Sequence, residues 1–90
     1  MTIQELHIKL KELEISEEKY YLHGVYGSTN DDDKLSLTIK KGKHLTKYEV
    51  YYKEKGEKHS VRTFTEEEDA CQYIHKRLKE NKEMENRYSK

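Results

Sequence analysis

The segment Y-E-V-Y-Y-K-E-K-G at residues 48–56, followed eight residues later by F-T-E-E-E-D-A-C-Q-Y at residues 64–73, decides the expected fold of this chain. Apolar and polar residues alternate along the first segment, as in a half-buried strand, and Gly56 supplies the positive φ of a hairpin turn. Thr65 followed by Glu68 is a capping box at the start of a helix. Strand, turn, strand and capped helix are therefore expected within 26 residues.

Helix patterns occur near both ends of the chain. Thr2 and Glu5 form a first capping box, and apolar residues recur every three or four positions after it. This spacing lines one face of a helix and predicts α-helix over Ile3–Leu13. The second box, its acidic first turn and a further apolar stripe predict a helix over Glu66–Leu78. From about residue 80 few apolar residues remain, so we expect a solvated or frayed tail.

Four strands are expected between the helices. The alternation is clearest over residues 35–40, where three apolar residues share one face, whereas over residues 20–26 it fits either face. In the last strand Val61 and Phe64 cannot share a face under strict alternation, so a bulge or a strand end is expected near Thr63. The expected strands are residues 20–26, 35–40, 46–53 and 59–64, with an Asp-rich loop at residues 27–33.

These elements predict a single small α+β domain with the order α-β-β-β-β-α. Short connections favour antiparallel pairing, so the expected architecture is a four-stranded antiparallel sheet with two helices on one face. The other face is left to water or to a partner. The periodic apolar positions predict a core of Leu6, Leu10, Leu37, Ile39, Val50, Ala70, Ile74 and Leu78.

The composition is unusual for a folded domain. Only 32% of the residues are hydrophobic and 40% are charged, against about 25% charged residues in a typical domain. Disordered chains favour a large net charge, whereas 18 basic residues here balance 18 acidic ones. We therefore expect a folded domain with a heavily solvated surface.

Charge and cysteine usage bear on partners and compartment. Zero net charge removes the long-range attraction to phosphate that supplies most non-specific nucleic-acid affinity, so no nucleic-acid partner is expected. Cys71 is the single cysteine and has no partner for an internal disulfide. No apolar run approaches the roughly 18–20 residues of a membrane span, and the N-terminus lacks the apolar core of a signal peptide. A cytoplasmic protein with no membrane partner is expected.

The sequence predicts neither a metal site, nor a cofactor, nor catalysis. Asp31, Asp32 and Asp33 are adjacent, whereas a calcium loop needs carboxylates at alternate positions with a Gly and a terminal Glu. Cys71 and His75 supply only two ligands, so Cys71 is expected to be a buried structural thiol. The remaining histidines are expected to be dispersed and exposed. No phosphate loop, nucleophile elbow or paired-carboxylate motif is present, so we expect no enzyme.

Tyrosine dominates the aromatic residues, with eight Tyr, one Phe and no Trp. Tyrosine is common at interface hot spots, but it is also a good strand former that covers the edge of a thin core. Tyr51 alternates with Val50, so we expect it on the open face of the sheet with Tyr21. The Asp loop is either a solvated tip or a group that docks into a basic cleft. The candidate partner contacts are Tyr21, Tyr51, Asp31, Asp32 and Asp33.

The two segments quoted at the start resemble a family of small immunity proteins from bacterial polymorphic-toxin systems. Members of that family read roughly W-E-V-Y-Y-S-E-R-G and then F-x-S/T-E-x-x-A-C-x-Y. The start of the chain, from Glu5 through Leu22, is also similar to the short helix and Y-S-L-type strand of the family. Tyr48 stands where Trp is common, Lys53 and Lys55 replace Ser and Arg, and the Asp-rich loop has no counterpart.

The resemblance implies a cytoplasmic protein that binds and neutralises a cognate toxin domain. A nuclease is the candidate toxin, because it would present a basic cleft to the Asp loop. A small adaptor or regulatory protein-binding module is the alternative, and a toxin gene immediately upstream would favour immunity. A double-stranded-RNA module also combines helices with a sheet, but its final helix should be basic, whereas residues 66–69 are acidic.

Overall fold

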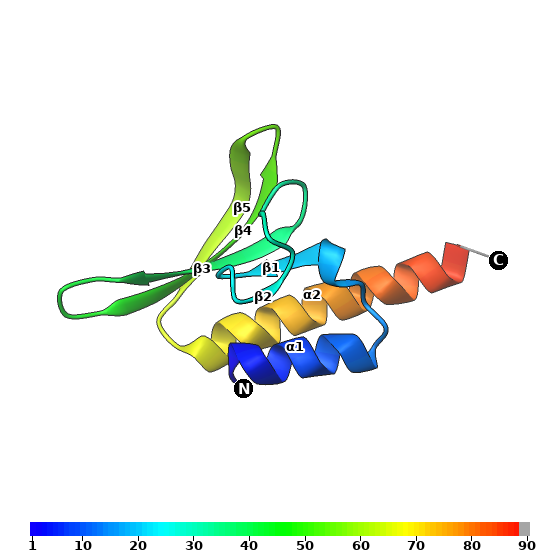
Figure 1. Ribbon diagram of the computed structural model, residues 1–90, viewed down its shortest axis with the longest axis horizontal. Helices are drawn as coiled ribbons and strands as arrows, with labels where there is room; N and C mark the ends of the chain where they lie inside the picture. Colours follow the sequence, from blue (N-terminus) through cyan, green and yellow to red (C-terminus); the bar gives the residue numbers. More distant parts are fainter. Residues whose placement is uncertain (89–90) are drawn as a thin grey trace.

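A computed structural model describes residues 1–88, which form an α+β domain (Figure 1). The two α-helices lie side by side and cover one face of the sheet, as predicted (Figure 1). In chain order the elements are α1 (Ile3–Glu12), the 3-10 helix η1 (Glu17–Lys19), β1 (Tyr20–Leu22), β2 (Tyr26–Gly27), β3 (Leu35–Lys41), β4 (Thr46–Glu54), β5 (Glu57–Phe64) and α2 (Glu67–Tyr88).

The first helix begins at the predicted capping box. The Glu5 amide donates to Thr2 Oγ1 at 3.2 Å, and the Thr2 amide donates to Glu5 Oε1 at 3.1 Å. The helix ends through a left-handed residue, Glu14, whose φ is 60°. The Ile15 amide then donates to the Leu10 carbonyl oxygen at 3.0 Å, and both of these side chains are buried. This is the Schellman pattern of a helix end.

The last helix is longer than the sequence predicts. It does not end at Leu78 but continues to residue 88, so the expected tail from about residue 80 is helical as far as the structure is described. Residues 89 and 90 of that tail lie outside the described residues. A contact distant in sequence supports the extension, since Lys19 Nζ of η1 lies 2.6 Å from the Glu85 carboxylate. No local pattern in residues 79–88 encodes this contact.

The sheet is mixed and has five described strands in the order β2-β1-β3-β4-β5. β1 is antiparallel to β2 but parallel to β3, with Tyr20 beside Leu35 and Leu22 beside Leu37. The β3–β4 and β4–β5 pairs are antiparallel. The prediction of four antiparallel strands is therefore wrong.

The parallel pair arises because a turn at residues 23–25 splits the expected first strand into β1 and β2. His23 and Gly24 in this turn have positive φ angles of 52° and 73°. The chain reverses here and reverses again in the Asp-rich loop, so β3 returns parallel to β1. Close approach of β2 to β1 requires Gly27, where a Cβ would stand 2.4 Å from the Tyr20 carbonyl oxygen.

The sequence predicts a bulge or a strand end near Thr63: β5 ends at the next residue, Phe64, and it also contains a bulge a few residues earlier. The β4–β5 register shifts between Val50 and Tyr52, where two steps along β4 face three along β5. Ser60 lies in the bulged stretch with a φ of 54°, and Val61 beside it is 47% exposed. Because of the bulge, Val61 is exposed while Phe64 packs against the core, so the two residues no longer have to share a face.

The core lies between the helices and the sheet. Seven of the eight predicted core residues are buried, and the eighth, Ile39, is partly buried and packs against them. Cys71 is buried as predicted, and its pKa is raised to about 12, first by burial and then by Glu67. The structure adds three residues to this cluster that the predicted core omits, namely Ile15, Tyr20 and Leu22.

Candidate functional site

Two of the predicted contact residues, Tyr51 and Asp31, bind each other. Tyr51 lies on the face of β4 opposite Val50, as predicted, but it is only 2% exposed. Its hydroxyl donates to Asp31 Oδ2 at 2.7 Å and lies 3.1 Å from Thr38 Oγ1, while Lys58 Nζ is 4.5 Å from its ring centre. Tyr51 is therefore not the exposed contact that the sequence suggests, because these neighbours cover it.

The hydrogen bond between Tyr51 and Asp31 affects the ionisation of both groups. Burial is the main cause that raises the pKa of Tyr51 to about 12, with Thr38 acting against the rise and Asp31 adding to it. The hydrogen bond from Tyr51 is the main cause that lowers the pKa of Asp31, and Lys53, whose Nζ lies 3.4 Å from Asp31 Oδ1, lowers it further. At neutral pH a phenol therefore donates to a carboxylate, which is a strong, charge-assisted hydrogen bond.

Tyr52, the next residue of β4, binds the same loop from the other face of the sheet. Successive side chains of a strand point to opposite faces, and the Tyr52 hydroxyl donates to the Asp33 carbonyl oxygen at 3.1 Å. The Asp33 amide donates to the Lys53 carbonyl oxygen at 2.7 Å. We call Tyr51, Tyr52, Asp31 and Asp33 the tyrosine clamp, because they hold the Asp loop against both faces of β4.

The other predicted contacts divide into two groups. Tyr21 is half-buried and pairs with Ser36, which in turn pairs with Tyr51, so Tyr21 and Tyr51 share one row on one face of the sheet. Asp32 and Asp33 are exposed on the loop. The structure thus brings both tyrosines onto the face opposite the helices, as predicted, and leaves two of the three Asp carboxylates facing solvent.

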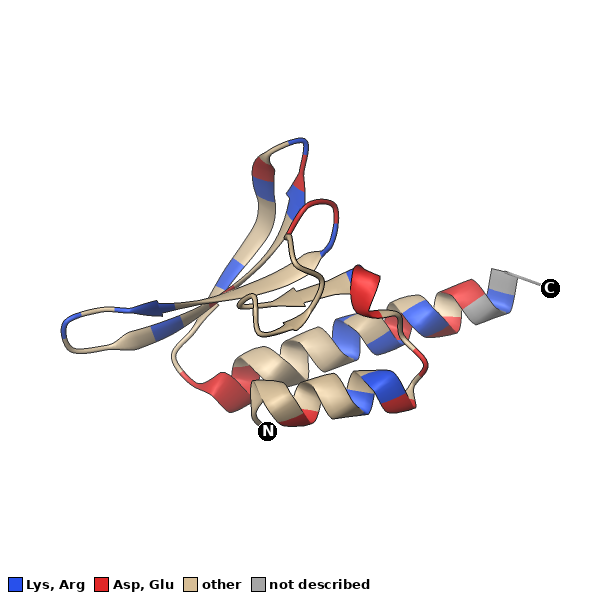
Figure 2. Cartoon of the chain, in the orientation of Figure 1, with Lys and Arg blue, Asp and Glu red and all other residues tan. Residues whose placement is uncertain are grey.

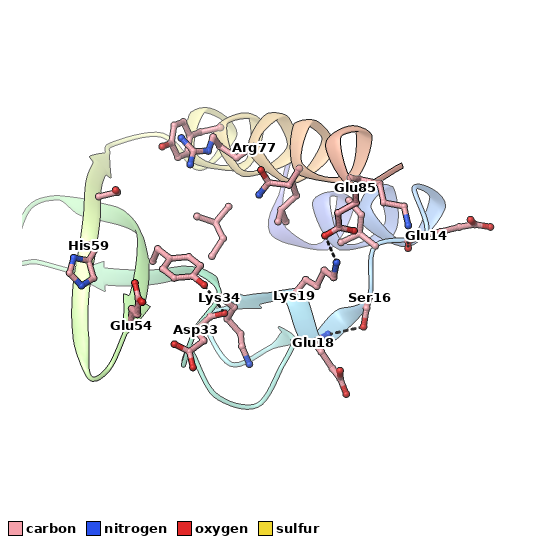
Figure 3. A pocket seen from close by; sticks show the side chains of 18 residues that line it. Glu14, Ser16, Glu18, Lys19, Asp33, Lys34, Glu54, His59, Arg77 and Glu85 are labelled. Atoms are coloured by element: carbon pink, nitrogen blue, oxygen red, sulfur yellow. Dashed lines mark hydrogen bonds and ion pairs between the residues drawn. The ribbon is translucent and has the colours of Figure 1, made fainter. Parts of the chain in front are cut away.

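A cleft of about 760 Å³ opens beside the clamp (Figure 3). Its walls are the β4–β5 hairpin, the C-terminal half of α2 and the chain from the end of α1 to η1, and the start of β3 forms part of its rim. No sequence motif predicts this cleft, because its walls come from segments that are distant along the chain. Its charged lining consists of Glu14, Glu18, Asp33, Glu54 and Glu85 together with Lys19, Lys34, Arg77 and Lys82.

Specific contacts hold the α2 wall of the cleft. The Tyr73 ring lies 5.6 Å from the Phe64 ring, and the Arg77 guanidinium lies 5.9 Å from the Tyr73 ring centre, within the range of a cation–π contact. Farther along α2, the ion pair between Lys19 and Glu85 joins η1 to the helix (Figure 3). These contacts fix Tyr73, Arg77 and Glu85 along the α2 wall of the cleft.

Three residues that line the cleft have a left-handed backbone, which glycine adopts at the lowest cost. They are Glu14 with φ 60°, Asp33 with φ 54° and Ser60 with φ 54°. Within residues 1–88 the other non-glycine residues with positive φ are His23 and Lys55, and both lie in tight turns. Glu14 belongs to the helix end of α1 and Ser60 to the bulge of β5, so these conformations shape two walls of the cleft.

Of the histidines, His59 lines the cleft, whereas His7 and His75 do not. His7 was expected to be exposed but is partly buried, with Nδ1 2.9 Å from the Tyr20 hydroxyl and its ring stacked on Tyr26. His75 is half-buried, and its pKa is lowered mainly by burial and then by Lys9. No group of three or more His, Cys, Asp or Glu side chains among the described residues is arranged to hold a metal ion.

Neither of the two described α-helices combines the length and the apolar character that crossing a membrane requires. Comparison with known proteins finds no relative: no protein-family model, no curated protein and no solved structure matches this chain.

Proposed function

We propose that the protein binds a toxin domain and neutralises it, as an immunity protein does. The resemblance of residues 48–56 and 64–73 to that family suggests the role. The structural observation that carries the proposal is the tyrosine clamp, which holds an exposed acidic loop in one conformation beside a cleft. A surface of this kind suits tight binding of a second protein.

The clamp matters because ordering a loop on binding costs free energy. A flexible loop loses about 1–2 kcal/mol of backbone entropy per residue when it is fixed, and that cost reduces the affinity. Here the cost is already met in the free protein by the hydrogen bonds from Tyr51 and Tyr52 and by the Asp33 amide. The exposed carboxylates of Asp32 and Asp33 are thereby presented in a fixed position.

The lining of the cleft favours a protein segment over a small apolar ligand. Small-molecule sites are mostly apolar with a few polar groups, whereas this cleft is lined by five acidic and four basic side chains, not counting His59. Protein interfaces carry about one hydrogen bond per 100–200 Å² and a polar rim. A partner segment with charges of both signs would find partners along these walls.

The residues of the site have different roles in this proposal. Asp32 and Asp33 contact the partner, and their charge favours a partner with a basic surface, such as the phosphate-binding face of a nuclease. Tyr51 and Asp31 are positioning residues, because they are engaged with each other and act through the loop that they hold. Tyr21 lies in the same row as Tyr51 and supports that face of the sheet.

The proposal is tested with the product of the adjacent open reading frame. We expect its toxin domain to copurify with this protein on co-expression, and we expect cells that express the toxin to survive only when this protein is present. The double variant Asp32→Asn with Asp33→Asn should weaken binding at least tenfold, since it removes the exposed charges and keeps the side-chain shape.

A matched variant, Glu12→Gln with Glu80→Gln, removes the same charge from exposed sites outside the cleft and should bind like the parent. Circular dichroism confirms that both variants are folded. Equal loss of binding in the two variants would mean that only net charge matters. A neighbouring protein that binds but has no toxic activity would favour an adaptor module instead.

A further inference from the structure

A second charged surface is formed by the β3–β4 hairpin, on the side of the molecule away from the C-terminal ends of both α-helices (Figure 1). Between Asp33 and Glu49 the chain carries five lysines and no Asp or Glu, although the protein as a whole is neutral. Most of this charge is on the hairpin that joins β3 to β4, which projects away from the body of the molecule (Figures 1 and 2). We call residues 40–47 the basic finger.

The lysines of the basic finger lie on both of its faces. Lys40 pairs with Lys47, and the next residue, Lys41, pairs with Thr46. Because successive side chains of a strand point to opposite faces, Lys40 and Lys47 project from one face and Lys41 from the other. Lys43 lies in the turn between the strands. The finger is therefore cationic all round, not on one side only.

The finger is exposed and its base is anchored. Lys40 forms an ion pair with Glu49 at 3.1 Å, and Lys58 binds the same carboxylate at 2.8 Å. Among the described residues, by contrast, no carboxylate lies within ion-pair distance of Lys41, Lys43 or Lys47, and all three are exposed. Three cations are thus available to a partner.

The tip of the finger carries one exposed apolar side chain, Leu45, beside Lys43 and His44. Leu45 is 51% exposed, and its carbonyl oxygen accepts a hydrogen bond from the Gly42 amide at 2.8 Å, which closes the turn. A shallow depression at the tip is lined by the finger's own residues. An exposed leucine ringed by lysines gains free energy when it enters an apolar pocket whose walls carry the opposite charge.

We infer that the basic finger inserts into an acidic-walled cleft of the partner protein, separate from the basic surface that faces Asp32 and Asp33, with Leu45 on an apolar floor. This inference rests on the proposed function. Cations on both faces fit a concave surface with acidic groups on two walls, whereas a flat anionic surface such as a membrane would meet one face alone. The exposed Leu45 and the neutrality of the whole chain favour a protein cleft over the groove of a nucleic acid, whose edges are lined by phosphates.

The test compares three variants of the full chain for binding to the purified toxin domain of the adjacent open reading frame. The finger variant replaces Lys41, Lys43 and Lys47 by Gln. The matched control replaces Lys55, Lys76 and Lys79 by Gln, which removes the same charge from exposed positions elsewhere. The third variant is Leu45→Ser. Binding kinetics are measured at several NaCl concentrations, and anisotropy with a fluorescent 20-base-pair DNA duplex is measured in parallel.

We expect the finger variant to lower the association rate constant about tenfold at low salt and to flatten its salt dependence, because steering charges act mainly on association. The control should change this rate constant less than about twofold. Leu45→Ser should raise the dissociation rate constant about tenfold, since a buried apolar anchor slows dissociation.

Three results overturn the inference, and each is distinct. If the finger variant and the control behave alike, net charge and not the finger steers binding. If the finger variant loses only binding to the DNA duplex, the finger serves a nucleic acid. If the parent protein does not bind the toxin domain at all, the proposed function itself fails and this inference falls with it.

Discussion

Tyr51 and Tyr52 are consecutive residues of β4, yet their hydroxyls bind one loop from opposite faces of the sheet, at Asp31 Oδ2 and at the Asp33 carbonyl oxygen. β4 therefore lies between the two hydrogen bonds. Side-chain alternation usually separates a buried face from a solvated one, whereas here it places one tyrosine hydroxyl on each face of β4, and both bind the Asp loop. The acceptor of the Tyr51 hydroxyl is a carboxylate oxygen, whereas the acceptor of the Tyr52 hydroxyl is a backbone carbonyl oxygen.

Replacing Tyr51 by Phe should raise the pKa of Asp31, because the hydrogen bond from Tyr51 is the main cause that lowers it. A lowered carboxyl pKa stabilises the fold above the ordinary value of about 4, and that contribution is lost as the pH falls through the folded-state pKa. The difference in unfolding free energy between the parent and Tyr51→Phe should therefore be larger at pH 7 than at pH 2. Carbon NMR of the Asp31 carboxyl and urea unfolding at both pH values measure the two effects.

Tyr52→Phe is the matched control for this change. It removes a hydroxyl that donates to the Asp33 carbonyl oxygen and not to Asp31. We expect it to leave the Asp31 titration as in the parent. An equal shift in both variants would show that loosening of the loop, and not the Tyr51 bond, sets the Asp31 pKa.

Two tyrosines should titrate late. Burial is the main cause that raises the pKa of both Tyr20 and Tyr51 to about 12. A raised phenol pKa stabilises the fold fully below the ordinary value of about 10, and the contribution is lost as the pH rises from about 10 to 12. Ultraviolet titration of tyrosinate should show amplitude near pH 12 that decreases in Tyr51→Phe. Loss of amplitude near pH 10 instead would mean that Tyr51 is accessible.

Truncation of the core should be costly in so small a domain. Leu37 and Ile74 are fully buried on the sheet and on α2, and either change to Ala should lower the unfolding free energy by about 2–5 kcal/mol. Val61 is 47% exposed, so Val61→Ala should stay within about 0.5 kcal/mol of the parent. Urea unfolding measures all three. A loss below about 1 kcal/mol at both buried sites would contradict the described core.

Glu14→Gly should stabilise the protein by about 1 kcal/mol, because Glu14 occupies the left-handed position of a Schellman end that glycine adopts without a Cβ penalty. Glu14→Ala is the control, since it removes the same carboxylate but keeps the Cβ, and it should bring no such gain. Thermal and urea unfolding compare the two. If both variants gain equally, loss of the charge and not relief of the backbone is responsible.

Local chemistry made several elements predictable from the sequence. The capping box of Thr2 and Glu5 starts α1 as expected, because both of its hydrogen bonds lie within one turn. Alternation over residues 35–40 and 46–53 correctly assigns β3 and β4, and Lys55 with Gly56 makes the tight turn into β5. The conflict between Val61 and Phe64 correctly indicates an irregularity or an end of β5 near Thr63, and the strand ends at Phe64 after a bulge that lies a few residues earlier.

The parallel pairing of β1 with β3 and the burial of Tyr51 were decided only by the tertiary structure. The sequence places Tyr51 on the correct face of β4. Whether that face is open depends on where the Asp loop folds. This loop is held by contacts between residues that are distant in the sequence, such as the hydrogen bond between Tyr51 and Asp31, which are 20 residues apart. The cleft and the extension of α2 likewise bring together residues that are distant in the sequence, such as Lys19 and Glu85, which are 66 residues apart. Periodicity and caps report interactions over a few residues, whereas pairing order and burial follow from the free energy of the whole assembled chain.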